Sequence, residues 1–170
     1  MVQKAHLVVV LLSFGMLGCF SPVSPDDVAD DPPQSVAAPP EIATAVVDLT
    51  NTERSRASLE ALRSNARLME AAQLHAEQMA RIGRLGHVLT DGTHPRPEDR
   101  LAAAGYRWQA YAENVAFGQR TAAEVVNGWM QSSGHRANML NPSYTEMGAG
   151  YARDSTGRPY WVQVFGRPLS

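Results

Sequence analysis

Two polar residues in the second half of this sequence lie where chemistry would be expected. Glu113 stands in the segment Ala112–Ala116, and His135 follows Ser133 and Gly134. The residues around both are small or turn-forming, which favours loops over apolar helix faces. A carboxylate and an imidazole held on loops by a rigid scaffold can bind a metal ion or transfer protons. The sequence therefore predicts a polar site with both residues, unless Glu113 binds a neighbouring strand or Arg136 instead.

Familiar catalytic motifs are absent from the sequence. It contains neither the His-Glu-x-x-His pattern of zinc peptidases nor the Gly-x-Ser-x-Gly turn of serine hydrolases. The single cysteine, Cys19, lies in the N-terminal region and is unavailable as a nucleophile. A hydrolase built from this chain would need a water activated by a metal ion or by a glutamate.

The N-terminal residues are typical of an export signal. Lys4 and His6 precede an apolar run, 7–17, that is too short to span a bilayer and long enough for the core of a signal peptide. The run ends at Gly18 and Cys19, as in the lipid-attachment sequence of bacterial lipoproteins. We expect residues 1–18 to be a signal peptide and Cys19 to be lipidated. The alternative is ordinary signal cleavage near Gly18 and secretion of the protein.

Residues 19–41 are expected to form a linker between the lipid anchor and a folded domain. They are rich in proline and aspartate, a composition that buries too little apolar surface to join a core. Because the lipidated N-terminus would anchor the protein, the membrane is one expected partner.

One cysteine per chain excludes an intramolecular disulfide, so the stability of an exported domain must come from its core.

The distribution of charge argues against a nucleic-acid partner. The sequence has 15 basic and 17 acidic residues, and the acidic excess is accounted for by Asp26, Asp27, Asp30 and Asp31 in the linker. The rest of the chain is close to neutral and has no basic stripe. Its length and its 44% apolar residues suit one domain, residues 42–168, which we expect to be a monomer.

The spacing of apolar residues predicts helices before and between strands. Helices are expected over residues 42–56, 68–82, 98–104 and from Thr121 onward, where Thr121 and Glu124 form a capping box. Strands are expected near residues 112–116, 147–152 and 160–165. The predicted fold class is α+β, with a small, mostly antiparallel sheet covered by helices on both faces.

Several motifs occur in the order found in the CAP superfamily, or SCP domain, which includes cysteine-rich secretory, pathogenesis-related and venom-antigen proteins. They are Asn51–Arg54, Ala71–Ala76, Ala104–Tyr106, Ala112–Ala116, Ser132–Pro142, Thr145–Tyr151 and Tyr160–Gly166. Each motif is weak alone, but the ordered set is specific and spans residues 46–166. The chain resembles the short bacterial form, and the resemblance implies a three-layer α-β-α sandwich with a central cleft.

The resemblance also implies which residues line that cleft. Glu113 matches the glutamate of the family's Gly-Glu-Asn motif, with Ala112 in place of the glycine. His135 matches the second cavity histidine. His87, which lies in the loop after the second helix, matches the first, and His94 competes weakly for that role.

A metal ion would be held by His87, Glu113 and His135, a set that suits zinc. Many eukaryotic relatives have a second glutamate three residues beyond the helix tryptophan, but Ser132 stands three residues after Trp129 here. Any zinc is therefore expected to bind weakly, and no cofactor is certain.

Three other polar residues have structural interpretations. His75 lies on the apolar stripe of the second helix, which predicts a buried histidine bonded to nearby backbone. Glu124 is explained by its capping box. Glu146 is the only spare acid near the cleft motifs, and we expect it to pair with an arginine.

These features predict an exported, lipid-anchored protein of the bacterial envelope that binds a small molecule, a lipid or a cell-wall component through its His/Glu cleft. A metal-assisted hydrolase of peptide or cell-wall material, using the same cleft, is the alternative. A third possibility is an interaction module whose cleft is vestigial. Binding is favoured over catalysis, because the family resemblance narrows the fold more than the function.

Overall fold

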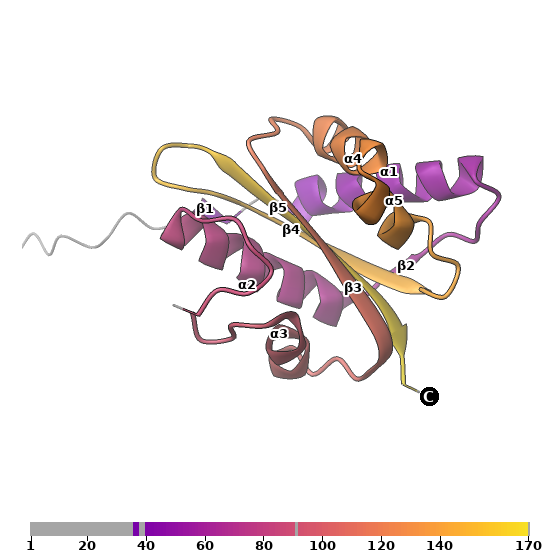
Figure 1. Cartoon of the computed structure of the whole chain (residues 1–170), viewed down its shortest axis with the longest axis horizontal. Helices are drawn as coiled ribbons and strands as arrows, with labels where there is room; N and C mark the ends of the chain where they lie inside the picture. The colour runs from indigo at the N-terminus through magenta and orange to yellow at the C-terminus, as the bar shows by residue number, and fades with distance from the viewer. Residues whose placement is uncertain (1–35, 38–39, 91, 170) are drawn as a thin grey trace, which may run out of the picture. The chain divides into compact units, whose positions relative to one another are not determined.

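Two long antiparallel strands, β4 (Glu146–Arg153) and β5 (Pro159–Pro168), run through the centre of the sheet. They belong to a computed structural model that describes residues 36–37, 40–90 and 92–169 (Figure 1). Cys19, the expected signal peptide and most of the expected linker lie outside the described residues. Asp154 closes the hairpin between the two strands, since its carboxylate accepts the backbone N–H groups of Thr156 and Arg158 at 2.9 Å.

Five strands make up the sheet in this part of the chain. The strand β3 (Trp108–Phe117) pairs antiparallel with β5, so the order is β1-β4-β5-β3. The short strand β2 (Arg63–Ser64) pairs in parallel with β4. The two-residue strand β1 (Val36–Ala37) pairs antiparallel with the other end of β4. The sheet thus includes two residues of the segment that was predicted to be a linker.

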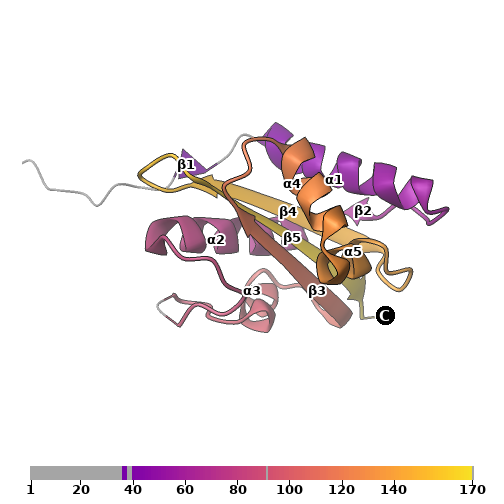
Figure 2. The same cartoon turned by 45° about the horizontal axis from the view of Figure 1, so that its top comes forward.

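Helices cover both faces of the sheet (Figures 1 and 2). On one face lie α1 (Pro40–Arg56), α4 (Ala122–Gln131) and α5 (Ser133–Met139). On the other lie α2 (Ala66–Ile82) and α3 (Pro97–Ala103). The α-β-α prediction is therefore confirmed.

Each face of the sheet has its own apolar core, because successive residues of a strand point to opposite sides. Val162 and Val164 of β5 pack with Leu68 and Met79 of α2. Trp161 and Phe165 belong to the core with α1, α4 and α5, which includes Trp129.

Helix ends follow the local sequence in two places that matter for the site. Gly83, with a positive φ of 70°, ends α2 and lets the chain turn into the segment that carries His87. Thr121 caps α4, since its hydroxyl accepts the N–H of Glu124 at 3.1 Å. Glu124 in turn accepts the N–H of Arg120 at 2.8 Å, which agrees with the structural interpretation of this glutamate.

Two local predictions were wrong. The break after α4 falls at Ser132, which is extended, and Ser133 and Gly134 begin the helix α5 instead of interrupting one. His135 is therefore on a helix. The loop expected around Glu113 is also wrong, because this residue lies in the middle of β3, opposite Val164 of β5 and within the strand expected near residues 112–116.

Candidate functional site

The carboxylate of Glu113 is the centre of the site. This residue is 8% exposed, and the neighbouring strand positions place it on the α2–α3 side of the sheet. Its Oε1 lies 2.9 Å from Nδ1 of His87, and its Oε2 accepts a hydrogen bond from Nη2 of Arg100 at 2.8 Å. A half-exposed imidazole and a buried guanidinium thus hold the two oxygens of one buried carboxylate.

Arg100 supplies the charge that makes this burial possible. It is 1% exposed on α3, and its guanidinium also donates to the backbone carbonyls of His87 (3.0 Å), His94 (3.2 Å) and Pro95 (3.3 Å). One side chain therefore fixes both the carboxylate and the loop that carries His87. A buried carboxylate without such a partner would carry a large desolvation cost.

The sequence analysis missed Arg100. It considered Arg136 as a partner of Glu113, but the ion pair is made by Arg100. A signal was present, because Arg100 stands beside Leu101 and four residues before Ala104, and both of these residues are buried. An arginine on the buried stripe of a short helix needs an acid or a set of carbonyls as partners.

His87 presents one free ring nitrogen to solvent. Its side chain is 51% exposed, and Nδ1 must carry the proton, because the ionised carboxylate of Glu113 can only accept. No group among the described residues partners Nε2. The hydrogen bond to Glu113 raises the pKa of His87 above its ordinary value, despite partial burial and the nearby charge of Arg100.

His75 is a second histidine near the carboxylate of Glu113, and it is buried. Its Nε2 donates to the carbonyl of Gly86 at 2.8 Å and lies 3.6 Å from Oε1 of Glu113. The expectation of a buried histidine bonded to backbone is confirmed. Nδ1 has no hydrogen-bond partner among the residues that the structure describes. Burial lowers the pKa of His75 even though Glu113 favours its charged form, so we assign the neutral ring.

The balance of charges keeps Glu113 ionised. Burial by itself would raise the pKa of this carboxyl. The hydrogen bond from His87 and the positive charge of Arg100 act in the opposite direction, and the pKa of Glu113 is lowered. Both oxygens accept hydrogen bonds, which stabilise the charged form of this carboxyl.

His135 approaches the same strand from α5. Its backbone carbonyl accepts a hydrogen bond from Nδ2 of Asn114 at 3.2 Å. The pKa of His135 is lowered by partial burial and then by the charge of His87.

A buried amide network holds α5 against the sheet. Asn114, which is 0% exposed, donates to Gln163 of β5 at 3.0 Å and accepts from Asn138 of α5 at 2.9 Å. Gln163 then donates to the hydroxyl of Thr50 in α1 at 2.7 Å. The sequence analysis named none of these bonds, which connect residues up to 113 positions apart.

The donor set does not form a three-ligand metal site. In the described part of the chain no three His, Cys, Asp or Glu side chains converge so that they could hold one ion. Both oxygens of Glu113 are engaged, and the guanidinium of Arg100 adds a positive charge beside it. We therefore derive no chemistry through a metal ion. Weak zinc binding by His87, Glu113 and His135 stays a prediction.

Glu146 does not contribute to this site. Its carboxylate accepts from Arg63 at 2.9 Å and from Asn65 and Tyr106 at 3.0 Å. The expected arginine partner is thus Arg63, and Glu146 connects β4 with the start of α2 and with the segment that follows α3.

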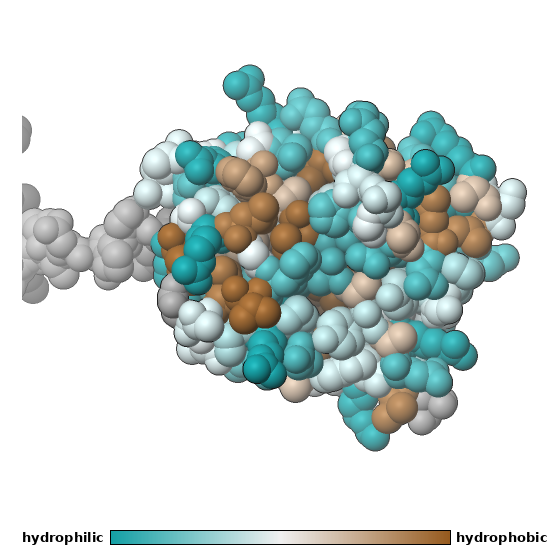
Figure 3. All heavy atoms as spheres, viewed as in Figure 1, coloured by the Kyte–Doolittle hydropathy of each residue, from teal (hydrophilic) through white to brown (hydrophobic). Residues whose placement is uncertain are grey.

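The surface around α2 and the following loop is partly apolar (Figure 3), and Val88, next to His87, is 52% exposed.

Comparison with known proteins shows which protein family this chain belongs to. The model of the cysteine-rich secretory protein family, CAP, matches residues 47–165, and the chain belongs to this family. It is 36% identical over 120 residues to the uncharacterized protein YkwD of Bacillus subtilis, and 32% identical over 120 residues to the uncharacterized membrane protein YlbC of the same organism. Both alignments cover 71% of this chain, but only 45% and 33% of the relatives.

Solved structures support the same fold. An extracellular SCP-domain protein of Bacillus anthracis superposes with a TM-score of 0.67 at 28% identity, over 75% of this chain and 40% of that one. An outer surface protein of Borrelia burgdorferi gives 0.71 at 18% identity, over 80% and 100%. Within the described residues we find no helix with the length and apolar character needed to cross a bilayer.

Proposed function

We propose that this protein is an exported, lipid-anchored CAP-domain protein of the bacterial envelope that binds a ligand through the cleft of His87, Glu113 and His135. The observation that carries the proposal is the ion pair of Arg100 with Glu113. It keeps a buried carboxylate charged, and that carboxylate fixes the ring of His87, whose Nε2 has no partner in the part of the chain that the structure describes. Such a preorganised polar group on a scaffold suits recognition, because little is left to order on binding.

The same ion pair favours binding over hydrolysis. A general base works best with a pKa near the working pH. The pKa of Glu113 is lowered, and hydrogen bonds to both of its oxygens stabilise the charged form, so it is a poor base for activating water. The exposed Val88 beside His87 indicates that the ligand has an apolar part.

Mass spectrometry of the protein purified from its native envelope tests the cleft. We expect a co-purifying small molecule that is lost in His87→Ala and in His135→Ala. The matched control is His94→Ala, which removes another loop histidine whose carbonyl alone contacts the site. Retention of the molecule by both cleft variants would contradict the proposal. Tight binding of Zn²⁺ at neutral pH would favour the metal-assisted hydrolase instead.

Export and anchoring rest on the sequence and on the relatives. The apolar run before Cys19 supports a lipidated N-terminus, and the B. anthracis and B. subtilis relatives are described as extracellular and membrane proteins. Cys19→Ser should move the protein from the membrane fraction to the soluble fraction. A variant that fractionates like the wild type, with a mature N-terminus elsewhere, would exclude the lipid anchor.

A further inference from the structure

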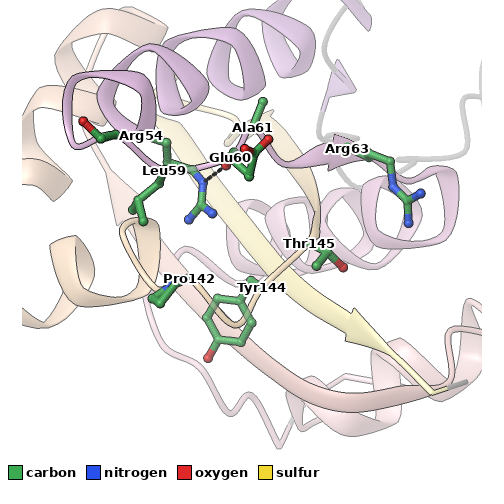
Figure 4. Close-up of a pocket in the computed structure, with 9 residues that line it drawn as sticks. Arg54, Leu59, Glu60, Ala61, Arg63, Pro142, Tyr144 and Thr145 are labelled. Carbon is green, nitrogen blue, oxygen red and sulfur yellow. Dashed lines mark hydrogen bonds between the residues drawn. The ribbon is translucent and has the colours of Figure 1, made fainter.

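A hollow lies between the end of α1 and the loop after α5, and neither His87 nor Glu113 is among its lining residues. Its volume is about 400 Å³, within the range of small-molecule sites. Figure 4 shows the side chains around it, and the guanidinium of Arg54 lies among them. The lining residues are Arg54, Ser58, Leu59, Glu60, Ala61, Arg63, Pro142, Tyr144 and Thr145.

The end of α1 places Arg54 in the hollow. Ser58 has a positive φ of 57°, which turns the chain back so that the N–H of Leu59 bonds to the carbonyl of Arg54 at 2.9 Å. The segment 59–61 then forms one wall. The loop with Pro142 and Tyr144 forms the facing wall (Figure 4).

Arg54 is a buried cation without an acid. It is 1% exposed, and Nε donates to the carbonyl of Glu60 at 2.9 Å. Nη1 donates to the carbonyls of Met139 (2.8 Å) and Asn141 (2.9 Å). No carboxylate of the described residues forms an ion pair with it, and Nη2 has no partner there. Arg100, the other buried arginine, has Glu113, so Arg54 differs in lacking a countercharge.

The lining of the hollow combines apolar and charged residues. Leu59, Pro142 and the ring of Tyr144 line the hollow, while the carboxylate of Glu60 and the hydroxyl of Thr145 lie among the polar lining groups. Arg63, the other lining arginine, is already paired with Glu146. The lining charges without an ion-pair partner among the described residues are therefore the guanidinium of Arg54 and the carboxylate of Glu60.

We propose that this hollow binds the α-carboxylate of an apolar amino-acid residue. The carboxylate contacts the free Nη2 of Arg54, since guanidinium groups bind carboxylates with strong, charge-assisted hydrogen bonds. The apolar side chain packs on Leu59, Pro142 and Tyr144, and Glu60 accepts the N–H of the residue. A volume of about 400 Å³ holds one or two residues, so the source is either a free amino acid or the C-terminus of a peptide.

NMR titration of the purified, ¹⁵N-labelled protein tests this assignment. N-acetyl-leucine should shift the Nε–H of Arg54 and the backbone amides of residues 58–61. N-acetyl-leucinamide, which has the same shape and no charge, should bind at least tenfold more weakly. Equal binding of the acid and the amide, or no shift at millimolar acid, would overturn the proposal. Tighter binding of free leucine than of N-acetyl-alanyl-leucine assigns the site to amino acids, and the reverse order assigns it to peptide C-termini.

Two pairs of variants separate ligand binding from a purely structural role of Arg54. Arg54→Gln should lose at least tenfold in affinity for N-acetyl-leucine, while Arg56→Gln, on the same helix but exposed, should not. Because Arg54 also donates hydrogen bonds to three backbone carbonyls, its variant can fail to fold.

Ala61→Trp is the test in that case, because the larger side chain fills the hollow and leaves the hydrogen bonds of Arg54 in place. It should abolish binding, while Ala57→Trp, outside the hollow, should keep it. Unchanged affinity in Ala61→Trp would show that the acid binds elsewhere.

Discussion

Arg100 shows how single residues determine this site. One guanidinium neutralises Glu113 and also holds the backbone of His87 and His94. Removing one partner of a buried pair leaves the other charge without compensation, which costs about 3–5 kcal/mol. We expect Arg100→Met to lower the free energy of unfolding by about that amount in urea denaturation. The double variant Arg100→Met/Glu113→Gln should recover part of the loss, and no recovery would contradict the ion-pair argument.

The histidines of the site should titrate in different pH ranges. The pKa of His87 is raised chiefly by its bond to Glu113, while burial lowers the pKa of His75. Below pH 6.5 the raised pKa of His87 favours the folded state. This contribution is lost as the pH rises through the pKa that His87 has in the folded protein. The lowered pKa of His75 acts in reverse, so its contribution is present above pH 6.5 and is lost as the pH falls.

NMR titration of the imidazoles measures both effects. We expect His87 to titrate above 6.5 and His75 to titrate below 6.5. Glu113→Gln should lower the pKa of His87, because it removes the charged acceptor of the Nδ1 proton. A pKa of His87 that does not change in Glu113→Gln would show that the 2.9 Å contact is not a hydrogen bond to a carboxylate in solution.

Only part of the site could be predicted at the scale of residues. The position of His87 beside Glu113 was anticipated through the family resemblance, and His75 through its place on an apolar stripe. Arg100 was not anticipated, because helical periodicity treats an arginine as a surface residue. Only the packing of α3 against β3 shows that this one is buried.

At the scale of elements, the close approach of α2 to β4 depends on two glycines. A Cβ on Gly148 or Gly150 would overlap the backbone of α2 at Leu68 and Ala72. The side chain of Gln73 completes the contact, since its amide donates to the carbonyl of Tyr151 at 3.0 Å and accepts its N–H at 3.1 Å. The helix thus replaces a neighbouring strand along this part of β4.

Gly150→Ala should therefore destabilise the domain by about 3 kcal/mol, because the helix backbone must move to admit the methyl group. Gly128 of α4 is the matched control, with no atom within 4 Å of an added Cβ. Gly128→Ala should raise stability by about 0.5–1 kcal/mol through its helix propensity. Thermal unfolding of both variants checks the contrast, and equal melting temperatures would contradict the packing argument.

Most elements could be predicted from apolar spacing and capping residues. The helix α5 could not, because Ser133 and Gly134 are weak helix formers. Its short length gives little intrinsic stability, and the bonds of Asn138 to Asn114 and the buried Met139 hold it in place. Contacts of this kind come from residues distant in sequence and leave no periodic signal.

At the scale of the whole molecule, side chains cover the outer edge of β3, which is the last strand in the order of the sheet. The carbonyls of Tyr111, Glu113 and Val115 point outward from the sheet, and they accept hydrogen bonds from Tyr144, Asn138 and Trp129 at 3.3–3.5 Å. Free strand edges pair with other chains, so side chains that occupy these carbonyls protect against such pairing. The expectation of a monomer stays a prediction.

The far end of β4 is covered by β1, which comes from the segment predicted to be a linker. Val36 and Ala37 pair with Arg153 and Ala152, so a protein that begins at Ser35 keeps this pairing and one that begins at Glu41 loses it. Two strand residues contribute only one or two net hydrogen bonds, worth about 1–2 kcal/mol. We expect the shorter protein to remain folded and to melt a few degrees below the longer one. Equal melting temperatures would show that β1 does not form in solution, and loss of folding would show that the sheet depends on this edge far more than its two residue pairs suggest.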